Sequence, residues 1–448
     1  MAASTDGAQP QECTGAPRPV TADVSDYRRR ILDDELDELF MQLPAVALEG
    51  PKAVGKTATA VRRAPTVMRL DQRADRALLD ADPGRLERDA GPILLDEWQR
   101  HPASWDLVRH SVDAEPRAGR FLLTGSATPS LAPTRSGAGR IVRLRMHPLS
   151  LAERGLPVAP TVRLADLLSG ARSAIAGDSP LDLRAYTAEI LSSGFPAIRS
   201  FHGRALTMQL DGYLARVVDT DVPEQGHRVN RPATLRAWLA AYAAATSTTA
   251  SYNSILDATA GDSDKPAKTT TIAYREALTK TWLLDPVPGW VPGSNQLNRL
   301  AQAPKHHLAD PALAARLLGA TETSLLRGHG PASVVKPFDG VLLGALFESL
   351  VTQSMRVYAQ PIDATVHHLR TQNGDHEIDL VVEGSDRRVI AFEVKLSPLV
   401  EEHDLTHLRW LASKLGERLA DAAVITTGPH AYRRRDGIAV IPAALLGP

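Results

Sequence analysis

Three patterns of apolar and polar positions follow one another along the chain. From residue 26 to about residue 159, short apolar runs alternate with segments of helical periodicity. Short apolar runs between helices are typical of parallel strands that are buried on both faces of a sheet. We expect such strands at residues 44–48, 66–70, 93–95, 121–123 and 141–144. This region therefore predicts an α/β fold with a parallel sheet and helices on both faces.

The next two patterns predict two further regions. Between residues 160 and 330, Leu, Ala and Arg recur at helical spacing with few strand candidates, which predicts a helical lid and connecting region. Between residues 335 and 448, a helix at 340–358 precedes alternating strands, a helix and a strand, which predicts a second α/β domain. Residues 1–25 are rich in Ala, Gly, Pro, Thr and Gln without periodicity, and we expect a disordered leader there.

Composition narrows the class of protein. With 43% hydrophobic and 23% charged residues the chain is typical of soluble globular proteins. Its formal net charge of -1 gives no overall attraction to nucleic acid or anionic lipid, so any nucleic-acid surface has to be local. The single cysteine, Cys13, excludes a disulfide framework within the chain and a cysteine zinc site. No apolar run approaches the roughly 18 residues of a membrane span, so we expect no membrane partner and a cytoplasmic location.

A phosphate-binding loop is the strongest motif. The pattern G-x-x-x-x-G-K-[ST] is matched by Gly50, Pro51, Lys52, Ala53, Val54, Gly55, Lys56 and Thr57. Glycines allow backbone N–H groups to turn toward phosphates, Lys56 would place a cation at the β- and γ-phosphates, and the Thr57 hydroxyl would bind Mg²⁺. A predicted strand precedes the loop and a predicted helix follows it. The sequence thus predicts ATP and Mg²⁺ as ligands.

Polar residues at the ends of the next strands extend this site. Asp96 and Glu97 follow the strand at 93–95. In P-loop ATPases an Asp at this place holds Mg²⁺ through water, and an adjacent Glu orients or deprotonates the attacking water. Thr124 follows the strand at 121–123 and is a candidate sensor of the γ-phosphate, with a role in a turn or helix cap as the alternative.

Arg140 is a further candidate for catalysis. It follows the flexible sequence at 136–139. An arginine on such a loop can reach the γ-phosphate of its own or a neighbouring subunit and stabilise charge in the transition state. The alternative is a solvated arginine without a catalytic role. A role in a neighbouring subunit would require a homo-oligomer.

The order of these motifs resembles the prokaryotic AAA-type ATP-binding proteins that carry a C-terminal domain of unknown function. The resemblance is carried by residues 48–57, 95–99, 123–126 and 145–150, and it extends to residues 213–223, 305–313 and 346–397. It implies an AAA-like P-loop NTPase core over 26–159, a helical, winged-helix-like middle region, and a C-terminal domain similar to restriction endonucleases.

The C-terminal strands contain a second group of charged residues. In the strand at 389–396 the apolar residues share one face, which leaves Glu393 and Lys395 together on the other. Asp379 points away from the apolar layer of its own strand, and a turn at 383–388 would join the two strands in a hairpin. This is the arrangement of PD-(D/E)xK nucleases, in which the two carboxylates hold Mg²⁺ and the lysine acts on water or phosphate. Glu348, on the preceding helix, matches the additional metal-binding acid of many such nucleases.

Two functions stay open at this stage. In the first, a Mg²⁺-dependent ATPase controls a C-terminal nuclease that acts on DNA or another nucleic acid. In the second, ATP drives a molecular switch, and the nuclease-like domain is a catalytically inert interaction or DNA-binding module. A helix at 269–278 followed by residues 282–284 fits the recognition helix and wing of a winged helix, or a helix that serves packing alone.

Overall fold

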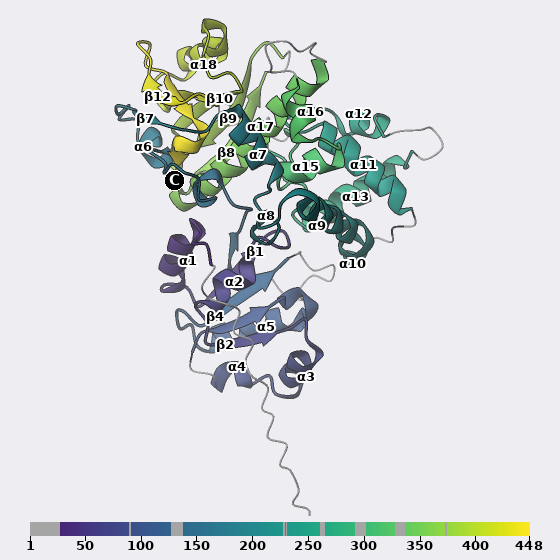
Figure 1. The fold of residues 1–448 in the computed structure, drawn as a ribbon. Coiled ribbons are helices and arrows are strands. Elements are labelled where there is room, and N and C mark those ends of the chain that lie inside the picture. Colours follow the sequence, from purple (N-terminus) through teal and green to yellow (C-terminus); the bar gives the residue numbers. More distant parts are fainter. Residues whose placement is uncertain are drawn as a thin grey trace, which may run out of the picture.

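The computed structural model describes residues 27–88, 91–126, 138–226, 229, 231–259, 265–291, 302–327, 337–371 and 374–448. The leader expected at 1–25 lies outside the described residues, as do residues 136–137 before Arg140. Figure 1 shows the N-terminal sheet at one end of the molecule, with the helical region and the C-terminal sheet side by side at the other.

Five parallel strands form the N-terminal sheet, as the apolar runs predict. Their order is β2-β3-β4-β1-β5. The strands are β1 (Ala45–Glu49), β2 (Thr66–Arg69), β3 (Ile93–Asp96), β4 (Phe121–Gly125) and β5 (Val142–Arg145). Because successive side chains alternate between faces, Val46 and Leu48 belong to one apolar cluster and Ala45 and Ala47 to another.

Helices cover both faces of this sheet. The cluster that contains Val46 also includes residues of α1 (Leu32–Phe40) and α2 (Lys56–Val61). The cluster that contains Ala45 includes residues of α3 (Arg73–Ala81), α4 (Arg85–Arg88) and α5 (Ala103–Ala114). This α/β architecture is the predicted fold class.

The middle of the chain is mainly helical, again as predicted. Its helices are α7 (Leu183–Leu191), α8 (Pro196–Arg199), α9 (Gly203–Arg216), the π-helix η4 (Val217–Asp221), α10 (Val222–Glu224), α11 (Pro232–Ala244), α12 (Tyr252–Asp257), α13 (Lys268–Lys280), α15 (Pro311–Leu317) and α16 (Glu322–Leu326). After α13, residues 284–287 pair with 305–308 through isolated antiparallel bridges. The winged-helix-like interpretation of this segment stays a prediction.

The first part of the region predicted to be helical contributes two short strands that pair with strands of the C-terminal domain. Strand β6 (Val162–Arg163) precedes α6 (Leu164–Leu168) and pairs with β14 (Leu446–Gly447). Strand β7 (Gly177–Asp178) pairs with β12 (His430–Arg433). Two-residue strands are too short to produce a period-2 pattern, so periodicity along the chain does not reveal them.

The C-terminal domain is a mixed seven-stranded sheet with the order β7-β12-β13-β11-β10-β9-β8. Its other elements are α17 (Pro337–Ala359), β8 (Thr365–Arg370), β9 (Glu377–Glu383), β10 (Val389–Lys395), α18 (Thr406–Leu415), β11 (Leu419–Thr426) and β13 (Ala439–Pro442). Strands β9 and β10 form the predicted antiparallel hairpin, whereas β10, β11 and β13 are parallel. Residues of α17 pack in one apolar cluster with Phe392, and residues of α18 pack in another with Val381.

Short 3₁₀ turns complete the chain: η2 (Trp98–Arg100), η3 (Leu151–Glu153), η5 (Gln360–Ile362), η6 (Glu402–Leu405), η7 (Gly416–Arg418) and η8 (Ala443–Leu445). One apolar cluster contains Val46 of β1, Leu239 of α11 and Phe392 of β10, so the three regions share a core. Within the described residues, we find no helix with both the length and the apolar character needed to cross a bilayer.

Candidate functional site

The loop between β1 and α2 has the curled backbone that a phosphate site requires. Gly50, Ala53 and Gly55 all have positive φ angles, of 149°, 68° and 101°. A Cβ atom on Gly50 would lie 2.2 Å from the carbonyl oxygen of Met146, so this close approach needs a glycine. The loop leads directly into α2, whose first turn has N–H groups without partners inside the helix.

Lys56 lies inside this loop. Its ammonium donates hydrogen bonds to the carbonyl oxygens of Gly50 and Pro51, both at 2.8 Å. Burial lowers the pKa of Lys56 to about 8, although the charges of Glu97 and Asp96 act in the opposite direction. The predicted phosphate cation is therefore held against the loop by carbonyl groups.

Three oxygen-bearing side chains meet beside the lysine. Thr57 Oγ1 donates to Asp96 Oδ1 at 2.7 Å, and Thr124 Oγ1 donates to the same carboxylate oxygen. The parallel strands β1, β4 and β3 are neighbours in that order, so their carboxyl ends bring these residues to one edge of the sheet. A hydroxyl beside a carboxylate is a donor set that suits a hard cation such as Mg²⁺. Thr57 and Asp96 fit the metal predicted for them.

Glu97 is turned toward the end of β4. Its backbone is left-handed, with φ 56°, and its N–H donates to Thr124 Oγ1 at 3.3 Å. Its carboxylate accepts hydrogen bonds from Gln99 and from Ser126 Oγ, the latter at 3.1 Å. Gln99 and Ser126 lie in the segments 95–99 and 123–126 that carry the resemblance to AAA-type proteins. Their hydrogen bonds to Glu97, however, are visible only in the structure.

Arg140 contacts helix α5 in the structure. Its Nε donates to Asp113 Oδ1 of α5 at 2.7 Å, and the side chain is half-exposed. The structure therefore does not bring Arg140 together with the loop. Action on a γ-phosphate, in this subunit or a neighbouring one, stays a prediction.

The middle region contacts the phosphate loop directly. The Lys52 ammonium pairs with Asp221 at the end of η4 and lies 3.9 Å from Glu224 of α10. The Tyr213 hydroxyl of α9 donates to the Lys52 carbonyl oxygen at 3.5 Å. Local sequence patterns do not predict the contacts of Asp221 and Tyr213 with Lys52, because more than 160 residues separate them from it.

A cavity of about 580 Å³ adjoins the loop on its helical side. Its walls come from the start of the described chain, the loop and α2, the segment after β5, and α7 to α9. Its lining includes Tyr27, Val54, Gly55, Pro196 and His202. No pattern in the sequence indicates this cavity, because its walls come together from four separate segments.

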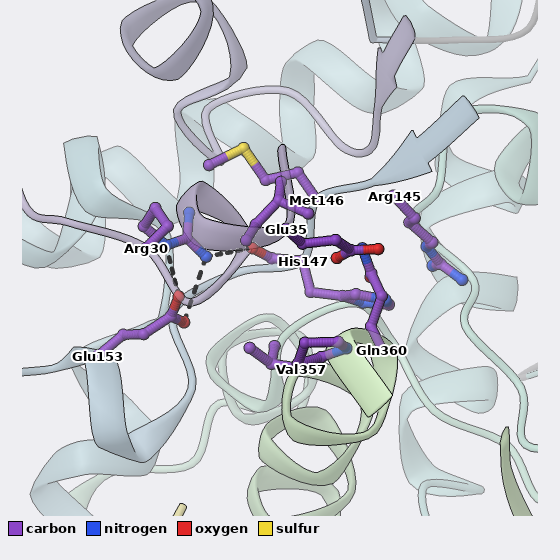
Figure 2. Close-up of a pocket in the computed structure, with 10 residues that line it drawn as sticks. Arg30, Glu35, Arg145, Met146, His147, Glu153, Val357 and Gln360 are labelled. Atoms are coloured by element: carbon purple, nitrogen blue, oxygen red, sulfur yellow. Dashed lines mark hydrogen bonds and ion pairs between the residues drawn. The ribbon is translucent and has the colours of Figure 1, made fainter. Parts of the chain in front are cut away.

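A smaller hollow lies where the N-terminal domain meets α17 and η5, and Figure 2 shows the residues around it. The Arg30 guanidinium pairs with Glu153 at 2.9 Å and donates to the His147 carbonyl oxygen at 2.8 Å. Gln360 donates to Glu35 at 3.0 Å across the same joint. The hollow has a volume of about 10 Å³, which can hold at most a single water molecule. It is therefore a joint between domains and not a ligand site.

Close to this joint, Asp285 of the middle region meets three basic side chains. Arg145 lies 2.9 Å from its carboxylate, His147 lies 3.6 Å away, and Arg356 of α17 is also paired with it. Burial lowers the pKa of Arg145 to about 10 and that of Arg356 to about 9. Burial also holds the pKa of His147 well below its ordinary value.

The acids predicted for a nuclease-like site do approach one another, but a lysine lies among them. The Lys305 ammonium is 2.8 Å from Glu348 Oε1, 3.2 Å from Asp379 Oδ1 and 3.5 Å from Glu377 Oε1. The Lys305 side chain is 1% exposed. Burial alone would lower its pKa, but the charges of Asp379 and Glu348 outweigh burial and raise it. Lys305 belongs to the segment 305–313, which resembles the AAA-type ATP-binding proteins, but the sequence predicts no role for this lysine.

Glu393 and Lys395 lie on the other side of Asp379. Lys395 pairs with Glu393 at 2.9 Å, and Asp379 Oδ2 accepts a hydrogen bond from the Val394 N–H at 2.9 Å. Burial, followed by the charge of Asp379, raises the pKa of Glu393 to about 8. The predicted proximity of Asp379, Glu393, Lys395 and Glu348 is thus present in the structure.

The metal-binding role predicted for these acids does not fit the geometry. Both Asp379 oxygens and Glu348 Oε1 already bond to Lys305 or to the backbone. In the part of the chain that the structure describes, no group of three or more His, Cys, Asp or Glu side chains is arranged to hold a metal ion. The assignment of Glu348, Asp379 and Glu393 as Mg²⁺ ligands stays a prediction, and in this conformation the Lys305 ammonium lies between the first two.

Comparison with known proteins agrees with the geometry of the N-terminal site. Residues 42–154 match the AAA domain family. The N-terminal region is thus similar to AAA domains over these residues, and its parallel sheet has the α/β fold predicted for it. Residues 183–324 match a domain of unknown function (DUF8612), and residues 343–446 match another (DUF4143). The C-terminal match names no activity, so it adds nothing for or against a nuclease.

Two similar proteins come from mycobacteria. "Uncharacterized protein Rv2008c" of Mycobacterium tuberculosis and "Uncharacterized protein Mb2031c" of Mycobacterium bovis are each 26% identical over 434 residues, which covers 93% of this chain and 83% of theirs. Among solved structures, the Walker-type ATPase PABY2304 of Pyrococcus abyssi has 16% identity and a TM-score of 0.40, covering 65% of this chain and 96% of that one. A variant of RuvB of Thermotoga maritima has 15% identity and a TM-score of 0.25, covering 60% and 94%.

Proposed function

We propose that the protein binds ATP with Mg²⁺ at the loop formed by residues 50–57 and hydrolyses it. The observation that carries this proposal is the convergence of Lys56, Thr57, Asp96 and Thr124 at one edge of the parallel sheet, with Glu97 next to them. A phosphate loop alone would support binding. A second acid that is held by its own hydrogen bonds supports hydrolysis as well.

The residues have separate tasks in this proposal. The N–H groups of the loop and of the first turn of α2 bind phosphate oxygens, and Lys56 leaves the carbonyl groups of Gly50 and Pro51 to meet phosphate charge. Thr57 and Asp96 hold Mg²⁺, which supplies charge neutralisation at the β- and γ-phosphates when bound. Glu97 accepts a proton from the attacking water, and Thr124 keeps Asp96 and the backbone of Glu97 in register.

The cavity beside the loop is the proposed place for the nucleoside. At about 580 Å³ it has the size of a small-molecule pocket, and it begins at Val54 and Gly55 of the phosphate loop. Tyr27 and Pro196 offer flat apolar surfaces for a base, while His202 offers a polar edge. Since Pro196 and His202 belong to the helical region, a bound nucleotide would contact both regions of the chain.

We favour a switch over a nuclease for the C-terminal domain. Asp379, Glu393 and Lys395 lie together as in nucleases, which is the observation in favour of cleavage. However, Lys305 occupies the acid cluster, and this favours an inert interaction module that ATP binding controls. We propose DNA or another nucleic acid as the partner of the C-terminal domain. A second copy of the chain, at Arg140 of the N-terminal domain, is the other proposed partner of the protein. A cytoplasmic location completes the proposal.

Lys56→Ala tests the proposal directly. The variant removes the cation that meets the phosphates, and we expect ATP affinity to fall by at least about 100-fold, since a charge-assisted contact is lost. Isothermal titration calorimetry with ATP and Mg²⁺ measures this change. Lys280→Ala, at an exposed position at the end of α13, is the matched control and should retain wild-type affinity. Wild-type affinity in a folded Lys56→Ala protein would refute the proposed site.

A further inference from the structure

The acid cluster of the C-terminal domain is built around a cation from another part of the chain. Glu348 comes from α17, and Glu377 and Asp379 come from β9, whereas Lys305 comes from the middle region. An ammonium group has three N–H donors, and here three carboxylates lie within 3.5 Å of it. Two of these carboxylates, those of Glu348 and Asp379, accept hydrogen bonds from the lysine, and Glu377 adds a third negative charge beside it.

The backbone holds Lys305 in this place. The Lys305 N–H donates to the Val287 carbonyl at 2.9 Å, and the Val287 N–H donates back to the Lys305 carbonyl at 2.8 Å. The neighbouring residues 288–290 bond in turn to His368 of β8, through bonds of 3.1 and 2.6 Å. The segment that carries the lysine is thus attached both to the middle region and to the edge strand of the C-terminal sheet.

A metal ion that shared these ligands would compete with the Lys305 ammonium. A hydrated Mg²⁺ would need the Glu348 and Asp379 oxygens that Lys305 already contacts, and its charge would lie beside that of the ammonium. Glu393 has a buried Oε1 without a hydrogen-bond partner among the described residues, but one free carboxylate oxygen does not make a metal site. The same carboxylates can serve either the lysine or a metal.

We infer that Lys305 is an intramolecular cation that takes the place of a divalent metal ion in the acid cluster and fastens the middle region to the C-terminal domain. The domain is consequently free of metal in this conformation, and the contact has to open before Glu348 and Asp379 can bind one. This inference does not depend on ATP hydrolysis, since its residues lie outside the nucleotide site.

Mn²⁺ binding to Lys305→Ala tests this inference. Removing the ammonium leaves space and a negative cluster, so the variant should gain one Mn²⁺ site per chain, at least about tenfold tighter than any binding by the ATP-free wild type. Electron paramagnetic resonance of free Mn²⁺ measures the binding, and Mn²⁺ should raise the melting temperature of the variant but not that of the wild type. Lys305→Ala combined with Asp379→Asn should lose the new site.

Lys395→Ala is the matched control. It removes the other lysine of the cluster but leaves Lys305 in place, so it should gain no Mn²⁺ site. A folded Lys305→Ala protein that gains no site would overturn the inference.

A measurement on the full-length wild-type protein covers the case in which Lys305→Ala does not fold. With saturating ATP, the wild type should bind one Mn²⁺ per chain, at the nucleotide. Two Mn²⁺ ions per chain, falling to one in Asp379→Asn, would overturn the inference. Absence of any Mn²⁺ with ATP would count against the proposed ATP site alone, because the acid cluster would then be free of metal as inferred.

Discussion

The buried ammonium of Lys56 makes ATP binding sensitive to pH. In the free protein, burial lowers its pKa to about 8, so a part of the population has a neutral lysine just above neutral pH. Phosphate charge in the complex favours the protonated form and raises this pKa. Binding therefore takes up a proton whenever the pH lies above the pKa of the free protein and below that of the complex.

We predict that ATP affinity is nearly constant below pH 7 and falls above about pH 8, by up to about tenfold per pH unit. Calorimetry in two buffers with different ionisation enthalpies should detect the uptake of a proton near pH 8.5. Lys56→Arg provides the comparison, since arginine stays charged and its affinity should not change between pH 7 and 9.5. A wild-type affinity that is constant from pH 7 to 9.5 would contradict the pKa argument.

Glu97 should separate binding from hydrolysis. Glu97→Gln keeps the shape of the side chain but removes the proton acceptor, so we expect ATP affinity near that of the wild type and a turnover rate lower by about 100-fold to 10,000-fold. Phosphate release under saturating ATP measures the rate. Asp96→Ala should behave differently and weaken the Mg²⁺ dependence of binding. Turnover by Glu97→Gln at the wild-type rate would show that another residue is the base.

At the level of residues, the sequence predicts what local spacing encodes. Lys56, Thr57, Asp96 and Glu97 are predictable because a loop, a strand and their order define them. Lys305 acquires its role only in the structure, because its partners lie 43 and 74 residues away and no spacing rule connects them. The Mg²⁺ role of Asp379 stays a prediction for a related reason: the alternation of the strand identifies the face of Asp379 but not the ammonium of Lys305 that contacts it.

At the level of elements, the contact of η4 and α10 with the phosphate loop links the helical region to the nucleotide site. Asp221 is buried and pairs with Lys52, and Glu224 also pairs with Arg100 at 2.9 Å. Both cations belong to the N-terminal domain. A change in the loop on phosphate binding would therefore act on the ends of these helices through charge.

A double-mutant cycle with Asp221→Asn and Lys52→Met should measure this link. Because the two side chains are only 7% and 18% exposed, we expect a coupling free energy of about 1–2 kcal/mol in urea unfolding without nucleotide. The exposed pair of Arg236 and Asp219 is the control and should give less than about 0.5 kcal/mol. Equal coupling energies for the two pairs would contradict the proposed link between the helical region and the phosphate loop.

Among the elements, hydrophobic periodicity along the chain predicts some strands and misses others. The apolar runs predicted all five strands of the N-terminal sheet, and the reason is clearest for β1, β3 and β4, whose residues are all buried. Alternation predicted the hairpin of β9 and β10 because one of its faces packs on α17. Strands β6 and β7 were missed, since two residues carry no period and their pairing partners lie more than 250 residues later.

At the scale of the whole molecule, three regions are held together by one apolar cluster and by Asp285. The carboxylate of Asp285 faces Arg145 of the N-terminal domain and Arg356 of α17, while Asp285 itself follows α13 of the middle region. No part of the sequence marks this residue, because its importance comes from the meeting of three distant segments. The guanidinium groups of Arg356, which is largely buried, and of Arg145, which is partly exposed, share this one carboxylate.

Asp285→Asn should destabilise the whole protein. The amide keeps the shape of the side chain but leaves the largely buried charge of Arg356 and the partly exposed charge of Arg145 without this carboxylate, and we expect the free energy of unfolding to fall by about 3 kcal/mol. Urea unfolding followed by tryptophan fluorescence measures this loss, with Trp282 beside Arg145 as a local probe. Asp219→Asn, which removes an exposed ion pair, should change stability by less than about 1 kcal/mol. If both variants unfold at the wild-type urea concentration, the contact at Asp285 does not hold the regions together, and the shared apolar core alone would have to do so.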